Sequence, residues 1–171
     1  MPKKVKNIKK HELRKVTLDP IYQSYWYSKF LNKLMLDGKK HLIEKTMSQL
    51  LYKFKLKYRA KPIMILFVSI IRLKPLIGTI TKRVGKLWKS VPYPLEPRRQ
   101  LVIALKWLVS QIKVEDEATL RARITTTFVA LLRKKSRNGK KHPKKSELLR
   151  KKKVHYGQVV KDRVNTRFRW R

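Results

Sequence analysis

The chain has no cysteine, five glycines and only ten acidic residues among its 171. Disulfides and thiolate metal sites are therefore excluded, and the four scattered histidines (11, 41, 142 and 155) do not have the spacing of a zinc site. The longest apolar run, 63–71, is about half the length that a membrane span requires. The first residues lack the apolar segment of a secretory signal. We expect no metal, no cofactor and no membrane partner.

Positive charge dominates what is present. Lysine and arginine number 46, which gives a formal net charge of +36. Such self-repulsion indicates a polyanionic partner, either nucleic acid or an anionic membrane surface. The cations recur along the whole chain, from Lys3 to Arg171, and this spread favours nucleic acid.

A packed core is also expected. Hydrophobic residues make up 42% of the chain, with four Trp, seven Tyr and five Phe, which is more than a disordered basic tail contains. The predicted fold is mainly α: a bundle of about six helices with a protruding β-hairpin ribbon. Residues 1–16 are expected to form a flexible basic arm, and residues 17–171 a single helical domain.

Apolar residues at helical spacing predict the first three helices. The first is expected to begin at Asp19-Pro20 and to end at Gly38, and the second to begin at Lys39 and Lys40. Residues 63–74 follow Pro62 and are nearly all apolar. Their length and the initial proline favour a buried helix over a strand.

Strand-forming residues then predict a hairpin over about 76–95, with Pro92 and Pro94 confining its second strand to an edge. A helix is expected from Glu96-Pro97, and another after the acidic residues 115–117, which would stabilise its positive end. Asn138-Gly139 is expected to terminate that helix. A basic loop over about 138–153 and a final amphiphilic segment would follow.

No motif in the sequence supports catalysis or nucleotide binding. Serine, histidine and aspartate occur, but no local arrangement brings them together as a nucleophile, a base and an acid, and neither glycine-rich phosphate loop is found. We therefore expect a protein that is not an enzyme and has no small-molecule substrate. Two other classes stay open: a nucleoid-type DNA-binding protein, and an RNA-processing enzyme.

Aromatic residues among the cations favour RNA. Trp88 lies between lysines, and Phe168 and Trp170 lie between arginines, where rings can stack on bases or riboses. Trp107 has neighbours typical of a core or half-core position and is expected to pack instead, and Trp26 is expected to pack as well.

Three stretches resemble the bacterial-type (bacterial and organellar) small-subunit ribosomal protein seven family. Residues 19–53 contain an Asp-Pro, a Lys-Phe-x-Asn-x-Leu-Met core and Asp-Gly-Lys-Lys. Residues 74–109 contain a Lys-Pro, an Arg-Val-Gly, a Val-Pro, two adjacent arginines and a Lys-Trp, in the order of that family's ribbon and following helix. The ending, with Asp162-Arg163 and Arg169-Trp170, is similar to the family's closing residues. Taken together and in order, the three are specific.

The resemblance implies a helical bundle with a β-ribbon that binds the 3′ major (head) domain of small-subunit ribosomal RNA and nucleates assembly of the head. It also implies neighbouring small-subunit proteins as partners, and a position near the exit-site tRNA and the mRNA exit path. The side chains that we expect to bind RNA are Lys3, Lys4, Lys6, Lys9, Lys10, Arg14, Lys39, Lys40, Lys82, Arg83, Lys86, Lys89, Arg98, Arg99, Lys140, Lys141, Arg167, Arg169 and Trp170.

The chain departs from the family pattern at three places. Gly85-Lys86 replaces a double glycine at the ribbon tip, the loop near 138–153 is longer and more basic, and the last helix is not rich in alanine. Lysine far outnumbers arginine, and isoleucine is frequent, as AT-rich genes encode. These features predict an organelle-encoded, mitochondrial source, with a plastid or bacterial source as the alternatives.

Overall fold

Six α-helices and one two-stranded ribbon form the part of the chain that the computed structural model describes, residues 18–59, 61–132 and 146–169. The helices are α1 (Tyr25–Leu34), α2 (Lys40–Tyr58), α3 (Pro62–Leu73), α4 (Pro97–Val114), α5 (Leu120–Leu132) and α6 (Glu147–Lys161). The strands are β1 (Ile77–Val84) and β2 (Leu87–Pro94), and a 3-10 helix, η1 (Asp162–Phe168), continues α6. The predicted fold class is confirmed. The expected arm, 1–16, lies outside the described residues, and the division of the chain into arm and domain stays a prediction.

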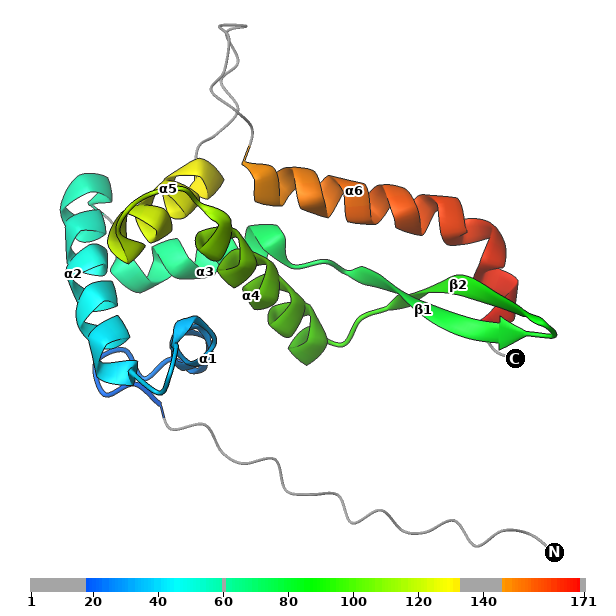
Figure 1. Ribbon diagram of the computed structural model, residues 1–171, viewed down its shortest axis with the longest axis horizontal. Coiled ribbons are helices and arrows are strands. Elements are labelled where there is room, and N and C mark those ends of the chain that lie inside the picture. The colour runs from blue at the N-terminus through cyan, green and yellow to red at the C-terminus, as the bar shows by residue number, and fades with distance from the viewer. Residues whose placement is uncertain (1–17, 60, 133–145, 170–171) are drawn as a thin grey trace, which may run out of the picture.

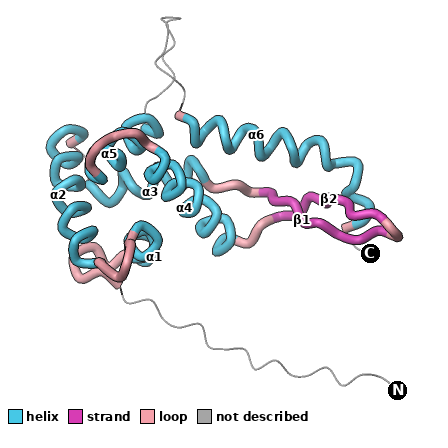
Figure 2. The backbone as a smooth tube through the Cα atoms, in the orientation of Figure 1, coloured by secondary structure: helices cyan, strands magenta, loops and turns pink. Residues whose placement is uncertain are grey.

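Helices α1 to α5 pack into a body, and the ribbon projects from it alongside α6 (Figures 1 and 2). The centre of the body is aromatic: the Phe128 ring meets Phe30 and Phe54 edge to face, with centroids 6.1 and 6.2 Å apart. Helix α3 is almost wholly apolar, and its residues Leu66, Ile70 and Leu73 are fully buried. The preference for a helix over a strand at 63–74 is therefore confirmed.

The first helix begins later than the sequence predicted. Asp19 caps a turn instead of a helix, since its Oδ2 accepts hydrogen bonds from the backbone N–H groups of Ile21 (3.1 Å) and Tyr22 (2.9 Å). Gln23, with a φ of +46°, then breaks the chain direction. The actual cap is Ser24, whose hydroxyl accepts from the N–H of Tyr27. The Asp-Pro pair was the wrong cap because aspartate stabilises isolated turns as readily as helix starts.

Other predicted boundaries also shift. Helix α1 ends at Leu34 rather than at Gly38, which lies in the following turn with a φ of +71°. The cap of α5 is Thr119, whose hydroxyl accepts from the N–H of Ala122, and no acid lies in the first helical turn. The predicted loop over 138–153 is wrong in its second half, because α6 already begins at Glu147. Asn138-Gly139, the expected end of α5, lies outside the described residues.

The ribbon is antiparallel, and Ile77 pairs with Pro94 at its base and Val84 with Leu87 at its tip. Its base needs glycine: a Cβ on Gly78 would lie 2.9 Å from Leu95 Cδ2. Helix α6 anchors the start of β1, because the Tyr156 hydroxyl accepts from the N–H of Leu76 (3.0 Å) and the His155 ring nitrogen lies 2.9 Å from the Ile77 carbonyl. The ribbon is thus held at its base by α6 while its tip extends beyond the body (Figure 1).

Candidate nucleic-acid interface

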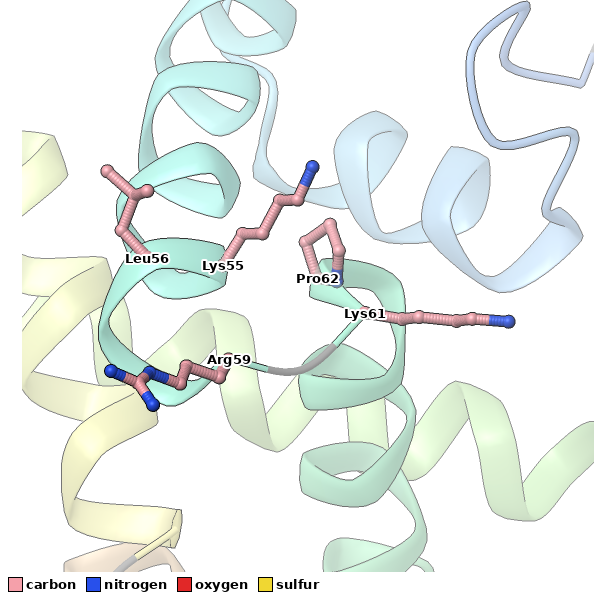
Figure 3. Close-up of a pocket in the computed structure, with 5 residues that line it drawn as sticks. All are labelled: Lys55, Leu56, Arg59, Lys61 and Pro62. Carbon is pink, nitrogen blue, oxygen red and sulfur yellow. The ribbon is translucent and has the colours of Figure 1, made fainter.

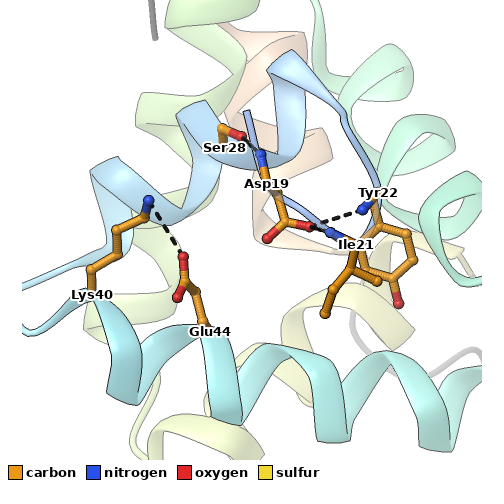
Figure 4. A network of polar contacts seen from close by, with 6 residues as sticks. All are labelled: Asp19, Ile21, Tyr22, Ser28, Lys40 and Glu44. Atoms are coloured by element: carbon orange, nitrogen blue, oxygen red, sulfur yellow. Dashed lines mark hydrogen bonds and ion pairs between the residues drawn. The ribbon is translucent and has the colours of Figure 1, made fainter. Parts of the chain in front are cut away.

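Acidic side chains contribute to internal contacts and leave most cations available. Glu44 forms an ion pair with Lys40 at 3.4 Å (Figure 4). Glu115 and Glu147 both accept from the Gln111 amide, at 3.1 and 3.2 Å. Ten carboxylates can pair one to one with no more than ten of the 46 cations. The remaining positive charge requires an external counter-charge.

The pleat of the ribbon divides the three cations on its strands between two faces, and the fourth, Lys86, lies in the turn. Paired residues of an antiparallel ladder point to the same side, so Lys82 and Lys89, which pair with each other, share a face with the pair Ile80 and Val91. Val91 is fully buried. Two lysines directly opposite each other repel, so this face depends on contacts beyond the ribbon. We call it the closed face.

The closed face is covered by η1. The Lys82 ammonium donates to the Arg169 carbonyl at 2.6 Å, and the Lys89 ammonium lies 4.8 Å from the centre of the Phe168 ring. The Asn165 amide donates to the Ser90 carbonyl of β2 at 2.9 Å. The expectation that Phe168 stacks on a base is therefore wrong: its ring is buried against the ribbon.

The opposite face, which we call the open face, carries the cross-strand pair of Arg83 and Trp88, and Trp88 is 71% exposed. The Arg83 Nε donates to the Gly85 carbonyl at 3.2 Å, which holds the guanidinium near the turn. Gly85 has a φ of +63°, whereas Lys86 has a negative φ. A two-residue turn with glycine required only at its first central position suits the ribbon twist, so lysine is accommodated where the family pattern has a second glycine.

Arg98 and Arg99 lie exposed in the first turn of α4, just beyond the base of the ribbon. The aligned peptide dipoles of this 18-residue helix make its N-terminus positive. In the free protein this positive end repels the two arginine side chains. A phosphate group placed there would be stabilised by the helix end and by the arginines. Their position fits the predicted contact with RNA.

The start of α2 carries the two predicted lysines of the first turn. Lys39 is exposed, and Lys40 is half-buried by its ion pair with Glu44 (Figure 4). Of the two, Lys39 has the side chain better placed to reach a phosphate.

A basic hollow between α2 and α3 was not predicted. It has a volume of about 590 Å³ and is lined by Lys55, Leu56, Arg59, Lys61 and Pro62. Figure 3 shows that the three cationic side chains point in different directions, so they do not converge on one ion. A cation at every second position from 53 to 61 was the signal in the sequence.

Two lysines have their charges directed inward. The Lys74 ammonium lies 3.9 Å from the centre of a Trp26 ring, and the Lys152 ammonium donates to the Arg72 carbonyl at 2.6 Å. Burial lowers the pKa of both lysines, because desolvation disfavours the charged form. These cations serve the packing of α3, and the interface lies elsewhere.

Comparison with known proteins identifies the family. A family model described as ribosomal protein S7p/S5e matches residues 4–153. The chain belongs to this ribosomal protein family. Proteins called small ribosomal subunit protein uS7 are similar to it: that of Helicobacter hepaticus is 34% identical over 121 residues, covering 71% of this chain and 78% of the relative. Those of Nautilia profundicola and Nitratiruptor sp. are each 35% identical, covering 65% and 75% of this chain and 72% and 83% of the relatives.

The family match assigns this S7p/S5e member as a structural constituent of the ribosome and not an enzyme. The matched residues include the whole ribbon and end at 153, so η1 lies beyond the match. The covering of the closed face by η1 therefore rests on the structure of this chain and not on the family match.

The predicted RNA-binding side chains of this S7p/S5e chain do not form one site. Arg167 and Arg169 lie with the ribbon cations, whereas Lys39 and Lys40 lie at the start of α2, in the body at the other end of the molecule (Figure 1). The remaining predicted residues lie outside the described ranges: Lys3, Lys4, Lys6, Lys9, Lys10, Arg14, Lys140, Lys141 and Trp170.

Within residues 18–59, 61–132 and 146–169 there is no group of three His, Asp or Glu side chains that could hold a metal ion. In the same ranges, the helices are all too short or too polar to span a membrane.

Proposed function

We propose that the chain is an RNA-binding structural protein of the small ribosomal subunit, which binds the head domain of the ribosomal RNA and nucleates its assembly. The observation that carries the proposal is the open face of the ribbon, where Arg83 pairs with an exposed Trp88 beside Lys86 in the turn, with no acid between Ile77 and Pro94. The uS7 relatives, whose name places them in the small subunit, support it.

Binding proceeds by neutralisation of phosphates. Each lysine or arginine that meets a phosphate releases condensed counterions, so the logarithm of the association constant falls with the logarithm of salt by about 0.7 to 0.9 per phosphate contact. Recognition then follows the shape of a folded RNA, since phosphate contacts fix position without reading sequence.

The test is the salt dependence of binding to a transcript of the small-subunit head domain. The full chain is expected to give a steep slope, and excess duplex DNA is expected to compete poorly. A flat salt response would overturn phosphate binding as the mechanism, and equal competition by duplex DNA would indicate a nucleoid-type protein instead.

The two faces of the ribbon provide matched variants. Changing both Arg83 and Lys86 to alanine should reduce the slope by about 1.4 to 1.8, because two phosphate contacts are lost. Changing both Lys82 and Lys89 to alanine should change the slope less, because these side chains contact Arg169 and Phe168 of the same chain. The reverse order would contradict the assignment of the open face to RNA.

We further propose that the ribbon lies near the exit-site tRNA and the mRNA exit path, and that the source is mitochondrial. The ribbon extends past the body, which supports its place near the tRNA and the mRNA. The amino-acid composition, typical of AT-rich genes, supports the mitochondrial source. If the first holds, the Arg83 and Lys86 variants should incorporate into subunits that sediment normally while translation slows. Recovery of the chain with bacterial or plastid subunits would contradict the second.

A further inference from the structure

Trp88 differs from the other two tryptophans that the structure describes. Trp26 packs edge to face on Phe67 at 5.2 Å, and Trp107 packs in the same way on His155 at 5.4 Å. Trp88 instead leaves 71% of its surface in solvent at the tip of the ribbon. An indole has the largest apolar face of any side chain, and a partner that covers it gains the free energy of burying that face.

The surroundings of this indole indicate a partner with phosphates. Arg83 pairs with Trp88 across the strands, and Lys86 lies in the adjoining turn. Between Ile77 and Pro94 there are four cations and no acid. Tryptophan and arginine also occur together in protein interfaces, but a ribbon with four cations and no acid of its own favours an anionic ligand.

The tip is also held rigid before any ligand arrives. Lys82, Lys89 and Ser90 on or next to the closed face contact the segment 165–169 through a hydrogen bond, a ring contact and a second hydrogen bond. The Arg83 Nε is fixed to the Gly85 carbonyl. A ligand that covers the open face therefore loses less free energy to ordering of the ribbon.

We propose that the open face of the tip binds an unpaired nucleobase of RNA: the Trp88 indole stacks on the face of the base, and Arg83 and Lys86 contact the phosphates on either side. A base inside a duplex has both faces covered by its neighbours, whereas bases in loops and bulges have a free face for an aromatic side chain. This inference rests on the proposed function and adds the kind of nucleotide that the ribbon selects.

The experiment compares two RNAs with the full-length chain: a stem closed by a loop of unpaired adenosines, and the same stem as a continuous duplex. Trp88→Ala should weaken binding to the stem-loop about tenfold, from the usual effect of removing one stacking aromatic. It should leave binding to the duplex unchanged. The salt slope of the variant on the stem-loop should equal that of the unsubstituted chain, because stacking releases no counterions.

Two further variants separate stacking from folding. Trp88→Phe keeps a flat ring and should keep most of the preference for the stem-loop, and the quenching of tryptophan fluorescence by the stem-loop should decrease in this variant. Leu87→Ala removes an apolar side chain that is 65% exposed on the neighbouring, closed-face position, and should change neither RNA affinity.

An equal loss on both RNAs for Trp88→Ala, or no loss on either, would overturn the stacking site. Unchanged RNA binding together with failure to sediment with small subunits would assign Trp88 to a protein contact, and so would also overturn it. The proposed function is tested separately, by the salt slope of the full chain, and stands or falls on that measurement.

Discussion

At the scale of single residues, burial sets the pH range in which the core is stable. Tyr27 is buried, and desolvation followed by the nearby Asp19 carboxylate raises the pKa of its hydroxyl well above the ordinary value of 10. The folded chain therefore holds this proton where the unfolded chain loses it. The stability that comes from Tyr27 is complete below pH 10 and is lost as the pH rises above 10.

Tyr27→Phe should remove that loss. The variant and the unsubstituted chain are expected to be equally stable at pH 8. Above pH 10 the free energy of unfolding of the variant should be the larger, by at most about 1.4 kcal/mol per pH unit for one proton. Thermal melts of the RNA-free chain from pH 8 to 11 measure this difference. A difference that stays constant across that range would contradict the raised pKa.

Gly85 and Lys86 differ in what the ribbon turn demands of them. Gly85 has a φ of +63°, at which a Cβ is strained, whereas the φ of Lys86 is negative. Gly85→Ala should lower the free energy of unfolding by about 1 to 2 kcal/mol. Lys86→Ala should change it by less than about 0.5 kcal/mol. Urea denaturation of both variants provides the comparison, and equal losses would show that the turn is not the cause.

At the scale of secondary-structure elements, the ribbon depends on η1. Two adjacent strands alone are marginal in water, and the Lys82–Lys89 pair weakens them further. Phe168 and the fully buried Val91 provide apolar contact on the side where η1 covers the ribbon. The ribbon is therefore an element whose stability comes from a segment far away in the sequence.

Phe168→Ala should expose the closed face and loosen the ribbon without unfolding the body. Hydrogen exchange of the amides in 77–94 should become faster, while the amides of α3 and α4 keep their protection. Val164→Ala, at an exposed position of the same 3-10 helix, serves as the control and should leave exchange in the ribbon unchanged. Uniformly faster exchange would mean that Phe168 stabilises the body instead.

The elements were predictable from the sequence where local signals act alone. Apolar spacing located α2, α3 and α4, and the run of strand formers around Gly85 located the ribbon. The start of α1 was missed because Asp19 had two local uses, and the start of α6 because its first turns are rich in lysine. Contacts between the segment 165–169 and the ribbon join residues 75 to 87 positions apart, for which a single sequence carries no local signal.

The sequence predicted the basic tip of the ribbon but not the division of its cations between two faces. The sequence identified Lys82, Arg83, Lys86 and Lys89 as one basic tip. The register places Lys82 and Lys89 on one face and Arg83 on the other, because alternate side chains of a strand point in opposite directions, and Lys86 lies in the turn. Lys55, Arg59 and Lys61 were missed because the hollow that they line depends on how α2 turns into α3.

At the scale of the whole molecule, the net charge of +36 acts against folding of the free chain. At physiological ionic strength, salt screens this repulsion between charges that are more than about 8 to 10 Å apart. The melting temperature of the free chain should therefore rise between 50 and 500 mM sodium chloride, values chosen to shorten the Debye length about threefold. Salt should weaken its complex with RNA over the same range, so a complex that gains stability with salt would contradict phosphate binding.

The covering of the ribbon by η1 also bears on the order of folding. A hairpin with a two-residue turn forms in about 1 to 10 μs, whereas contacts between distant segments must first close a long loop of chain. The Lys82–Arg169 hydrogen bond spans 87 positions, and the Leu76–Tyr156 bond spans 80. The body and a loose hairpin should therefore form early, and the ribbon should gain its final rigidity only in the slowest step, when α6 swings back along it.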